Sequence, residues 1–335
     1  MNFEIYYSRA GFGLSKDARI LSEALAFLGH DVVVKELPKA GEGFGGKFNE
    51  KLQTLCMLFS MLFFYRKLQR IFLGKPTVVA IHLEKIFYWK LFLHRHHVLI
   101  PNQEWFNPKQ FSLLSFVDGI WAKTSFAVGI FAEFKSNICR IGFSSSVEPI
   151  STSAKTRDYF FSRVGMSRFR GAEVLVNLWR SHPEWPLLKL VIDNSCRPLN
   201  PPHNVEYLDI FLNYEDYIAC SSAALFHIYA TETEGFGHSI VEAMGSGAVV
   251  LVTDAPPMNE IANSTCALMV GSFYKGQKWF SPRFSVLPAE LEAAVNKALQ
   301  MSGEETQKIV DNAMLRPNIL KQDFYSSLAS AIQKL

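Results

Sequence analysis

The sequence predicts an α/β protein built from two Rossmann-like domains that face each other across a cleft. Strand-like and helix-like segments alternate along both halves of the chain, as expected for parallel sheets covered by helices. A polar stretch rich in Ser and Thr, residues 144–157, separates the halves and is the expected linker. The length of 335 residues is also more than one ordinary core accommodates.

The first elements form a β-turn-α-β unit of the Rossmann kind. Residues 3–7 are a short apolar strand, and a turn containing Gly11 and Gly13 follows it. Residues 15–28 then show an amphipathic pattern, with Ser15 as the expected N-cap. The next strand is expected at residues 31–34.

The rest of the first half contains four apolar runs that are typical of buried parallel strands: residues 77–82, 97–101, 119–122 and 137–141. Residues 49–72 predict a long apolar helix flanked by Lys and Arg. It is either a buried helix of this domain or an interfacial helix that docks on anionic lipids. A second aromatic and basic patch is expected from Phe87, Tyr88, Trp89, Lys90 and Phe92.

The second half repeats the alternation. Helices are expected at residues 172–180, 214–221, 238–244 and 289–299, and strands at 187–192, 205–207, 224–228 and 248–253. A final amphipathic helix is expected at 321–334. We therefore expect three parts: an N-terminal Rossmann-like domain at 1–150, a C-terminal Rossmann-like domain at 151–317, and a C-terminal helix at 318–335 that returns to the first domain.

One segment of the second half carries the chemistry. After a strand, Gly235 and Gly237 allow a sharp turn and a close backbone approach to a ligand. Ser239 and its neighbours then open a helix, whose free N–H groups and dipole suit a diphosphate. Glu242 lies about one turn into that helix, where it can accept hydrogen bonds from ribose hydroxyls. Glu234 lies before the loop, where a sugar ring would bind.

The segment from Glu234 to Glu242 resembles the E-x7-E signature of retaining GT-B glycosyltransferases, especially glycosyltransferase family 4. The resemblance covers nearly the whole chain and is more specific in the second half. It implies a GT-B fold, with Glu234 at the donor sugar as a catalytic residue and Glu242 at the ribose. It also implies donor contacts from the residues between them, namely Gly235, Phe236, Gly237, His238 and Ser239.

Two other segments resemble donor-binding parts of that family. Arg170, before the first helix of the second domain, stands where the family usually has a Lys that grips the diphosphate. Arg can bind phosphate through two donors, and Arg163 and Arg168 could share the role. The loop of Gly11, Phe12 and Gly13 resembles the N-terminal loop that covers the diphosphate and donor sugar.

Three residues of the first domain are further candidates. His82 ends an apolar strand, and the resemblance implies a catalytic position near the donor sugar, although a strand-end His is also often structural. Asn102 and Glu104 follow the next strand. Because strand carboxyl ends face the ligand crevice in open α/β sheets, both are candidates for donor or acceptor contact.

The composition limits cofactors and partners. The net charge of +3 is too small for a nucleic-acid binder, and the five Cys residues form no CxxC pattern. We expect no metal and no cofactor, because no clear DxD, HxxxH or HExxH pattern occurs. The cluster of His94, His96 and His97 is expected to be a basic surface turn. No signal peptide or membrane-spanning run is evident, so we expect a cytoplasmic protein, peripheral on the inner face of the cytoplasmic membrane if residues 49–72 dock there.

The expected function is transfer of a sugar, with retention, from a UDP- or GDP-linked donor to a glycan or lipid-linked acceptor. Envelope polysaccharide or lipopolysaccharide synthesis would suit such an acceptor. The alternatives are another GT-B enzyme, such as a nucleotide-sugar epimerase or a phosphorylase, and a non-catalytic nucleotide-sugar-binding scaffold. A nicotinamide-dependent oxidoreductase is disfavoured, because the loop at Gly11 lacks a third glycine at the right spacing.

Overall fold

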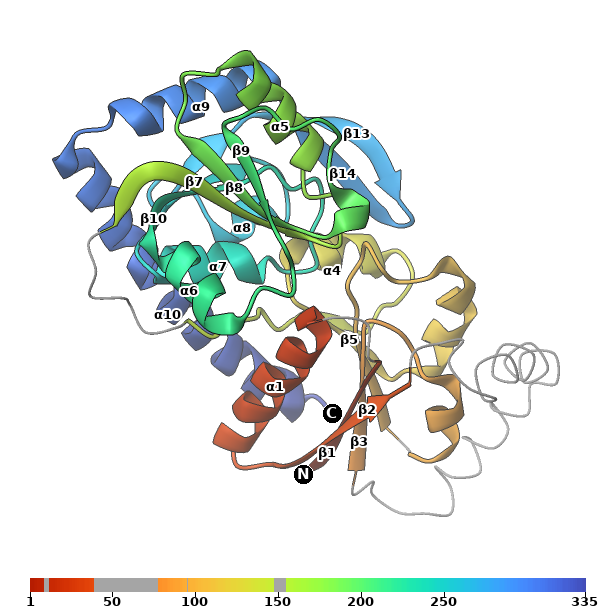
Figure 1. Cartoon of the computed structure of the whole chain (residues 1–335). Coiled ribbons are helices and arrows are strands. Elements are labelled where there is room, and N and C mark those ends of the chain that lie inside the picture. Colours follow the sequence, from red (N-terminus) through yellow and green to blue (C-terminus); the bar gives the residue numbers. More distant parts are fainter. Residues whose placement is uncertain (9–11, 39–77, 95, 148–154) are drawn as a thin grey trace. The chain divides into compact units, whose positions relative to one another are not determined.

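The computed structural model describes residues 1–8, 12–38, 78–94, 96–147 and 155–335, with the side chains of Phe12 and Trp89 left out. The chain divides into two compact units (Figure 1). Unit 1 comprises Met1–Gly142 and Asp323–Leu335, and unit 2 comprises Phe143–Gln322. The predicted interfacial helix at 49–72 lies outside the described residues.

Unit 1 contains a parallel six-stranded sheet with the order β2-β1-β3-β4-β5-β6. The strands are β1 (Asn2–Ser8), β2 (Asp31–Leu37), β3 (Val78–Leu83), β4 (His96–Ile100), β5 (Gly119–Ala122) and β6 (Ile138–Arg140). The other elements are α1 (Phe12–Phe27), α4 (Ser125–Ala132), and the 3-10 helices η1 (Tyr88–Phe92) and η2 (Pro108–Phe116). Nearly all of β3 to β5 is buried, which explains their continuous apolar runs.

Three sequence predictions for unit 1 are wrong. Helix α1 begins at Phe12, so Ser15 lies inside the helix and is not its N-cap. Phe87, Tyr88 and Lys90 are buried, so they form no exposed aromatic and basic patch. His97 is also fully buried, so the His cluster is not a surface turn.

Unit 2 contains a second parallel sheet with the order β12-β11-β10-β7-β8-β9. Numbered along the chain from β7, this is the 3-2-1-4-5-6 order of dinucleotide-binding folds. The strands are β7 (Thr156–Gly165), β8 (Leu187–Ile192), β9 (Val205–Leu208), β10 (Ala224–Tyr229), β11 (Val249–Thr253) and β12 (Leu268–Val270). Strand β7, at the centre of this sheet, was not predicted from the sequence, and its first residues were assigned to the linker.

Helices cover both faces of the unit 2 sheet. They are α5 (Ala172–Ser181), α6 (Tyr214–Ala223), α7 (His238–Gly245), α8 (Met258–Ile261), α9 (Pro288–Gln300) and α10 (Gly303–Gln333). Figure 1 shows α5 and α9 on one face and α6 and α7 on the other. A 3-10 turn, η3 (Asn194–Cys196), and a separate antiparallel hairpin of β13 (Ser272–Lys278) and β14 (Ser281–Val286) complete the unit.

The core of unit 2 lies on both faces of its sheet because neighbouring side chains of β7 point in opposite directions. Phe160 packs with Trp179 of α5 and with Phe226 of β10. Phe161 belongs to the other face, where Tyr217 of α6 packs against it. This two-sided burial holds β7 and β10 side by side at the centre of the sheet.

Helix α10 is longer than predicted, with 31 residues and Pro317 inside it. Its last residues, from Asp323 on, belong to unit 1. None of the helices in the described ranges is both long enough and apolar enough to cross a membrane.

Candidate functional site

The site in unit 2 forms where two loops leave the sheet at the same edge. Strands β7 and β10 are parallel neighbours. The chain adds β8 and β9 on one side of β7 and then adds β10, β11 and β12 on the other side, so the strand order reverses between β7 and β10. Such a switch point is where open α/β sheets bind ligands, outside the carboxyl ends of the strands. The loop after β7 carries Arg170, and the loop after β10 carries Glu234.

Arg170 and Glu234 form a two-point ion pair across these loops. The guanidinium Nη1 lies 2.8 Å from Glu234 Oε1, and Nη2 donates to Oε2 at 3.0 Å. The side chain of Glu234 is 6% exposed and that of Arg170 is 26% exposed. Burial weakens screening, so this pair is stronger than a surface salt bridge, and its partly open Arg can still reach a ligand.

Close backbone packing fixes the two loops against each other. Gly171 has a φ of +73°, and a β-carbon there would lie 2.2 Å from the carbonyl oxygen of Ala230. The amide of Glu232 donates to the carbonyl of Phe169 at 2.7 Å. Phe169 and Gly171, which flank Arg170, are therefore both held against the loop after β10. This explains why Arg170 lies next to Glu234.

Glu242 has a different set of partners. Ser145 donates its hydroxyl to Glu242 Oε1 at 2.9 Å, and Arg163 Nη1 lies 4.0 Å from Oε2. Arg163 is also within 3.4 Å of the Tyr217 hydroxyl and stacks over that ring at 4.9 Å. Burial raises the pKa of Tyr217, while the charge of Arg163 opposes that shift. Each glutamate of the motif therefore has an arginine within 4.0 Å.

The turn into α7 has the form that the sequence predicts. Gly237 is the N-cap with a φ of +106°, and a β-carbon there would meet the Ile261 side chain at 2.9 Å. Phe236 is buried and packs edge-on against Phe143. Gly235 and Ser239 are also buried, and His238 is half-buried with Nδ1 at 3.0 Å from the Ser145 hydroxyl.

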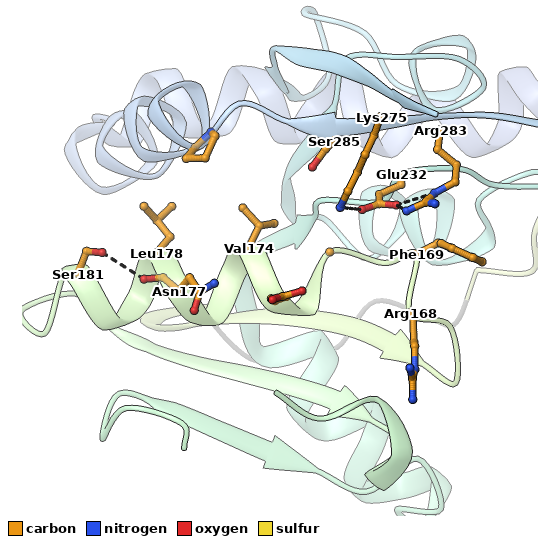
Figure 2. Close-up of a pocket in the computed structure, with 13 residues that line it drawn as sticks. Arg168, Phe169, Val174, Asn177, Leu178, Ser181, Glu232, Lys275, Arg283 and Ser285 are labelled. Atoms are coloured by element: carbon orange, nitrogen blue, oxygen red, sulfur yellow. Dashed lines mark hydrogen bonds and ion pairs between the residues drawn. The ribbon is translucent and has the colours of Figure 1, made fainter. Parts of the chain in front are cut away.

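Arg168, the remaining arginine candidate, lies apart from the glutamates. Its guanidinium donates to the Ser195 carbonyl at 3.3 Å, and Figure 2 shows it directed away from the Glu232 cluster. A pocket of about 500 Å³ has Glu232 and Phe169 among its lining residues. Figure 2 shows these residues between α5 and the hairpin. Residues of both loops line the pocket, but its lining includes neither Arg170 nor Glu234.

His82 is fully buried in unit 1, within a chain of hydrogen bonds. The Phe87 amide can only donate, so His82 Nδ1 accepts it at 3.2 Å, and His82 Nε2 carries the proton. That proton faces His97 Nδ1 at 3.1 Å, and His97 Nε2 in turn donates to the His94 carbonyl at 2.8 Å. Both ring nitrogens of His82 therefore serve contacts inside unit 1.

A polar network lies at the carboxyl edge of the unit 1 sheet. Asn102 donates to Glu84 Oε2 at 3.3 Å and accepts from Lys123 at 2.9 Å, and Lys123 forms a 2.5 Å ion pair with Asp17. Burial raises the pKa of Glu84, against the hydrogen bond from Asn102 and the charge of Lys123. Glu104, two residues after Asn102, is also buried.

The N-terminal loop is only partly described. Gly11 lies outside the described residues, Phe12 begins α1, and Gly13 lies in the first turn of that helix. This loop belongs to unit 1, whereas Arg170 and Glu234 belong to unit 2. Within the described ranges, no group of three or more His, Cys, Asp or Glu side chains could hold a metal ion.

Sequence reasoning missed three polar groups of these sites. Arg163 was expected only to share the phosphate-binding role of Arg170, and its contact with Glu242 depends on β7, which was not predicted. Ser145 was placed in the linker with no role, because its partner Glu242 is far away in the sequence. Glu84 has a φ of +66°, a backbone conformation that the sequence does not reveal.

Comparison with known proteins identifies the fold. No protein-family model matches the chain, and no curated protein matches it. Among solved structures, sucrose-phosphate synthase from Thermosynechococcus elongatus is similar with a TM-score of 0.68 and 14% identity, over 99% of this chain and 98% of that one. The lipopolysaccharide outer core galactosyltransferase WaaB has a TM-score of 0.66 and 12% identity, over 100% of both chains. Anabaena HepE, solved with UDP and glucose, has a TM-score of 0.66 and 13% identity, also over 100% of both.

These likenesses extend over both units of the chain, and each unit has a parallel six-stranded sheet with helices packed on it. The predicted α/β class and GT-B fold are confirmed.

Proposed function

We propose that the chain is a glycosyltransferase that uses a nucleotide-diphosphate sugar as donor and retains the anomeric configuration. The observation that carries the proposal is the ion pair of Arg170 and Glu234 at the switch point of unit 2. A cation for the diphosphate and a carboxylate for sugar hydroxyls stand side by side there. Glu242 lies in the helix that follows, where ribose hydroxyls would reach it.

The donor would lie along the loops in a fixed order. The diphosphate accepts hydrogen bonds from Arg170 and from the amides at the start of α7, near His238 and Ser239. A guanidinium has five donors, so Arg170 can hold Glu234 and a phosphate oxygen together. Gly235, Phe236 and Gly237 shape the turn that brings this backbone close to the ligand.

The proposed reaction needs charge stabilisation more than a nucleophile. The bond from the anomeric carbon to the diphosphate breaks, and the acceptor oxygen bonds to that carbon on the same face. The acceptor proton leaves with a phosphate oxygen. Arg170 stabilises the negative charge that grows on the diphosphate, and Glu234 holds the sugar through its hydroxyls.

Unit 1 would supply the remaining contacts. Gly11, Phe12 and Gly13 are proposed to cover the donor, and Asn102 and Glu104 to contact donor or acceptor. We do not propose a catalytic role for His82, because both of its ring nitrogens form hydrogen bonds inside unit 1.

UDP is the first nucleotide to test, with GDP as the next. HepE was solved with UDP and glucose, and the pneumococcal O-GlcNAc transferase GtfA, another similar structure, with UDP and GlcNAc. The proposed acceptor is a glycan or a lipid-linked glycan of envelope polysaccharide or lipopolysaccharide synthesis. WaaB, named for the lipopolysaccharide outer core, is a structural precedent for that class.

The test is a thermal-shift screen with UDP-, GDP-, ADP- and CMP-sugars. A true donor binds the folded protein and therefore raises its unfolding temperature. At a donor concentration of one hundred times its Kd, the free energy of unfolding increases by about 2.7 kcal/mol. Glu234→Gln keeps the size of the side chain, and it should lose most of the shift from the intact donor. If no nucleotide sugar stabilises the protein, or if Glu234→Gln binds and turns over the donor as the wild type does, the assignment of this site is overturned.

A further inference from the structure

The β13–β14 hairpin stands apart from the main sheet of unit 2. Its two strands pair only with each other among the described strands. Its middle is fixed by Glu232, which accepts hydrogen bonds from Lys275 at 2.6 Å and from Arg283 Nε at 2.9 Å. Figure 2 shows both contacts. The Phe284 amide also donates to the Glu232 carbonyl at 2.9 Å. The hairpin is therefore firmly anchored to the rest of unit 2.

The hairpin exposes aromatic and cationic side chains. Phe273, Tyr274 and Trp279 are 46%, 57% and 40% exposed. Residues 272–286 contain three cations and no Asp or Glu. One of those cations, Lys278, lies 4.4 Å from the centre of the Trp279 ring. Exposed large aromatics beside Lys are typical of segments that lie at the level of lipid headgroups.

The turn of the hairpin contains a bulky residue in a backbone conformation that bulky residues rarely adopt. Lys278 pairs with Ser281, so the loop consists of Trp279 and Phe280. Trp279 has a φ of +53°, a conformation that is a rare outlier for a bulky residue. Two-residue hairpin loops with a positive φ at their first position favour Gly there. An aromatic residue held in such a position costs stability, which points to a use for it at the tip.

We propose that this hairpin docks unit 2 on an anionic lipid surface. Trp279 and Tyr274 would enter the headgroup layer, and Lys278 would stay beside Trp279 at the level of the lipid phosphates. Glu232 offsets one of the three positive charges of the hairpin, and the charge that remains complements such a surface. The proposal uses only residues 272–286 and does not rest on the glycosyltransferase assignment.

The test compares sedimentation of the full chain with two kinds of vesicle. The wild type should bind phosphatidylcholine vesicles that contain phosphatidylglycerol, bind pure phosphatidylcholine vesicles less, and be released by NaCl. Trp279→Gly should bind the anionic vesicles about tenfold more weakly. Lys278→Gln should weaken binding about fivefold. Phe211→Ala removes an aromatic of unit 2 that is 74% exposed, and it should bind as the wild type does.

The Trp279→Gly variant also guards against a folding artefact. Glycine suits the positive φ at this position, so the variant should unfold at a temperature no lower than the wild type. Brominated phosphatidylcholine in the anionic vesicles should quench tryptophan fluorescence in the wild type and less in this variant. If the wild type ignores anionic vesicles, or if Trp279→Gly binds them equally well, the proposal is overturned. Binding of a soluble polysaccharide by the hairpin without vesicle binding would overturn it too, and would assign the aromatics to a glycan.

Discussion

Gly171 and Ala230 approach each other so closely that a β-carbon on Gly171 would lie 2.2 Å from the Ala230 carbonyl oxygen. The contact joins the loops that follow β7 and β10. It sets the position of Arg170, the preceding residue, against Glu234. A single methyl group at Gly171 therefore tests both the fold and the donor site.

Gly171→Ala should destabilise unit 2 by the strain of a left-handed residue, about 1–2 kcal/mol, plus about 1–3 kcal/mol for displacing the loop. Gly165→Ala is the matched control, because Gly165 has a similar φ of +66° and a β-carbon added there would meet no atom within 4 Å. Denaturant unfolding of both variants separates strain from collision. Equal losses of stability would show that the close contact does not constrain the loops.

Replacing Arg170 should affect the donor site more than replacing its neighbour. Arg170→Met removes the charge that faces Glu234 and should weaken binding of a nucleoside diphosphate about 10- to 100-fold, the effect of one charge-assisted contact. Arg168→Met is the control, because its guanidinium contacts the Ser195 carbonyl. Calorimetric titration with UDP and GDP measures both. Equal affinities for the two variants would contradict the assignment of Arg170.

Glu242 should distinguish ribose from deoxyribose. Its carboxylate is held by Ser145, so Glu242→Gln should reduce the preference for UDP over 2′-deoxy-UDP. Ser145→Ala should reduce the same preference about three- to tenfold, because it loosens the carboxylate through one hydrogen bond. Ser246→Ala, which removes a hydroxyl at the end of α7, is the control. An unchanged ratio of the two affinities in Glu242→Gln would argue that the ribose binds elsewhere.

His227 should make unit 2 sensitive to mild acid. It is fully buried, and burial together with the charge of Lys155 lowers its pKa to about 3. As the pH falls below about 6.5, the unfolded chain takes up this proton and the folded chain does not. Stability contributed by neutral His227 is therefore present above about pH 6.5 and falls by about 1.4 kcal/mol per pH unit as the pH drops towards about 3.

The measurement for His227 is urea unfolding at about pH 7, 6 and 5. The wild type should lose about 2 kcal/mol more than His227→Gln across that range. Glutamine does not titrate, and its amide can still donate to the Ser221 carbonyl that His227 Nε2 contacts at 3.0 Å. Parallel curves for the two proteins would mean that another group sets the acid response.

The sequence predicted most of the fold because parallel strands buried on both faces leave long apolar runs. Strand β8 and strand β5 were predicted at their observed bounds, residues 187–192 and 119–122. Strand β7 was missed, because it begins with Thr156, Arg157 and Asp158 and has Arg163 among its last residues. A central strand with polar ends does not stand out from a linker until its neighbours are known.

The candidate site was predicted where it is local in sequence. Glu234 lies in the loop before α7 and Glu242 lies in that helix, so their short separation in the sequence already placed both beside one turn. Their partners Arg170 and Arg163 come from the far side of a strand crossover, and only the β7–β10 pairing brings them near. The hairpin at 272–286 was not predicted either, because its strands carry exposed aromatics and cations with no apolar face that repeats.

Unit 1 is assembled from two stretches of chain that are far apart in sequence, and this sets an order for its synthesis. Residues 323–335 close against the first 142, with Arg140 paired to Asp323 at 2.6 Å and Phe324 fully buried. During translation, all of unit 2 leaves the ribosome before that closing segment does. Unit 1 is therefore the first unit whose synthesis begins and the last whose synthesis ends. Until residues 323–335 have been synthesised, the apolar surface of unit 1 that they cover stays exposed.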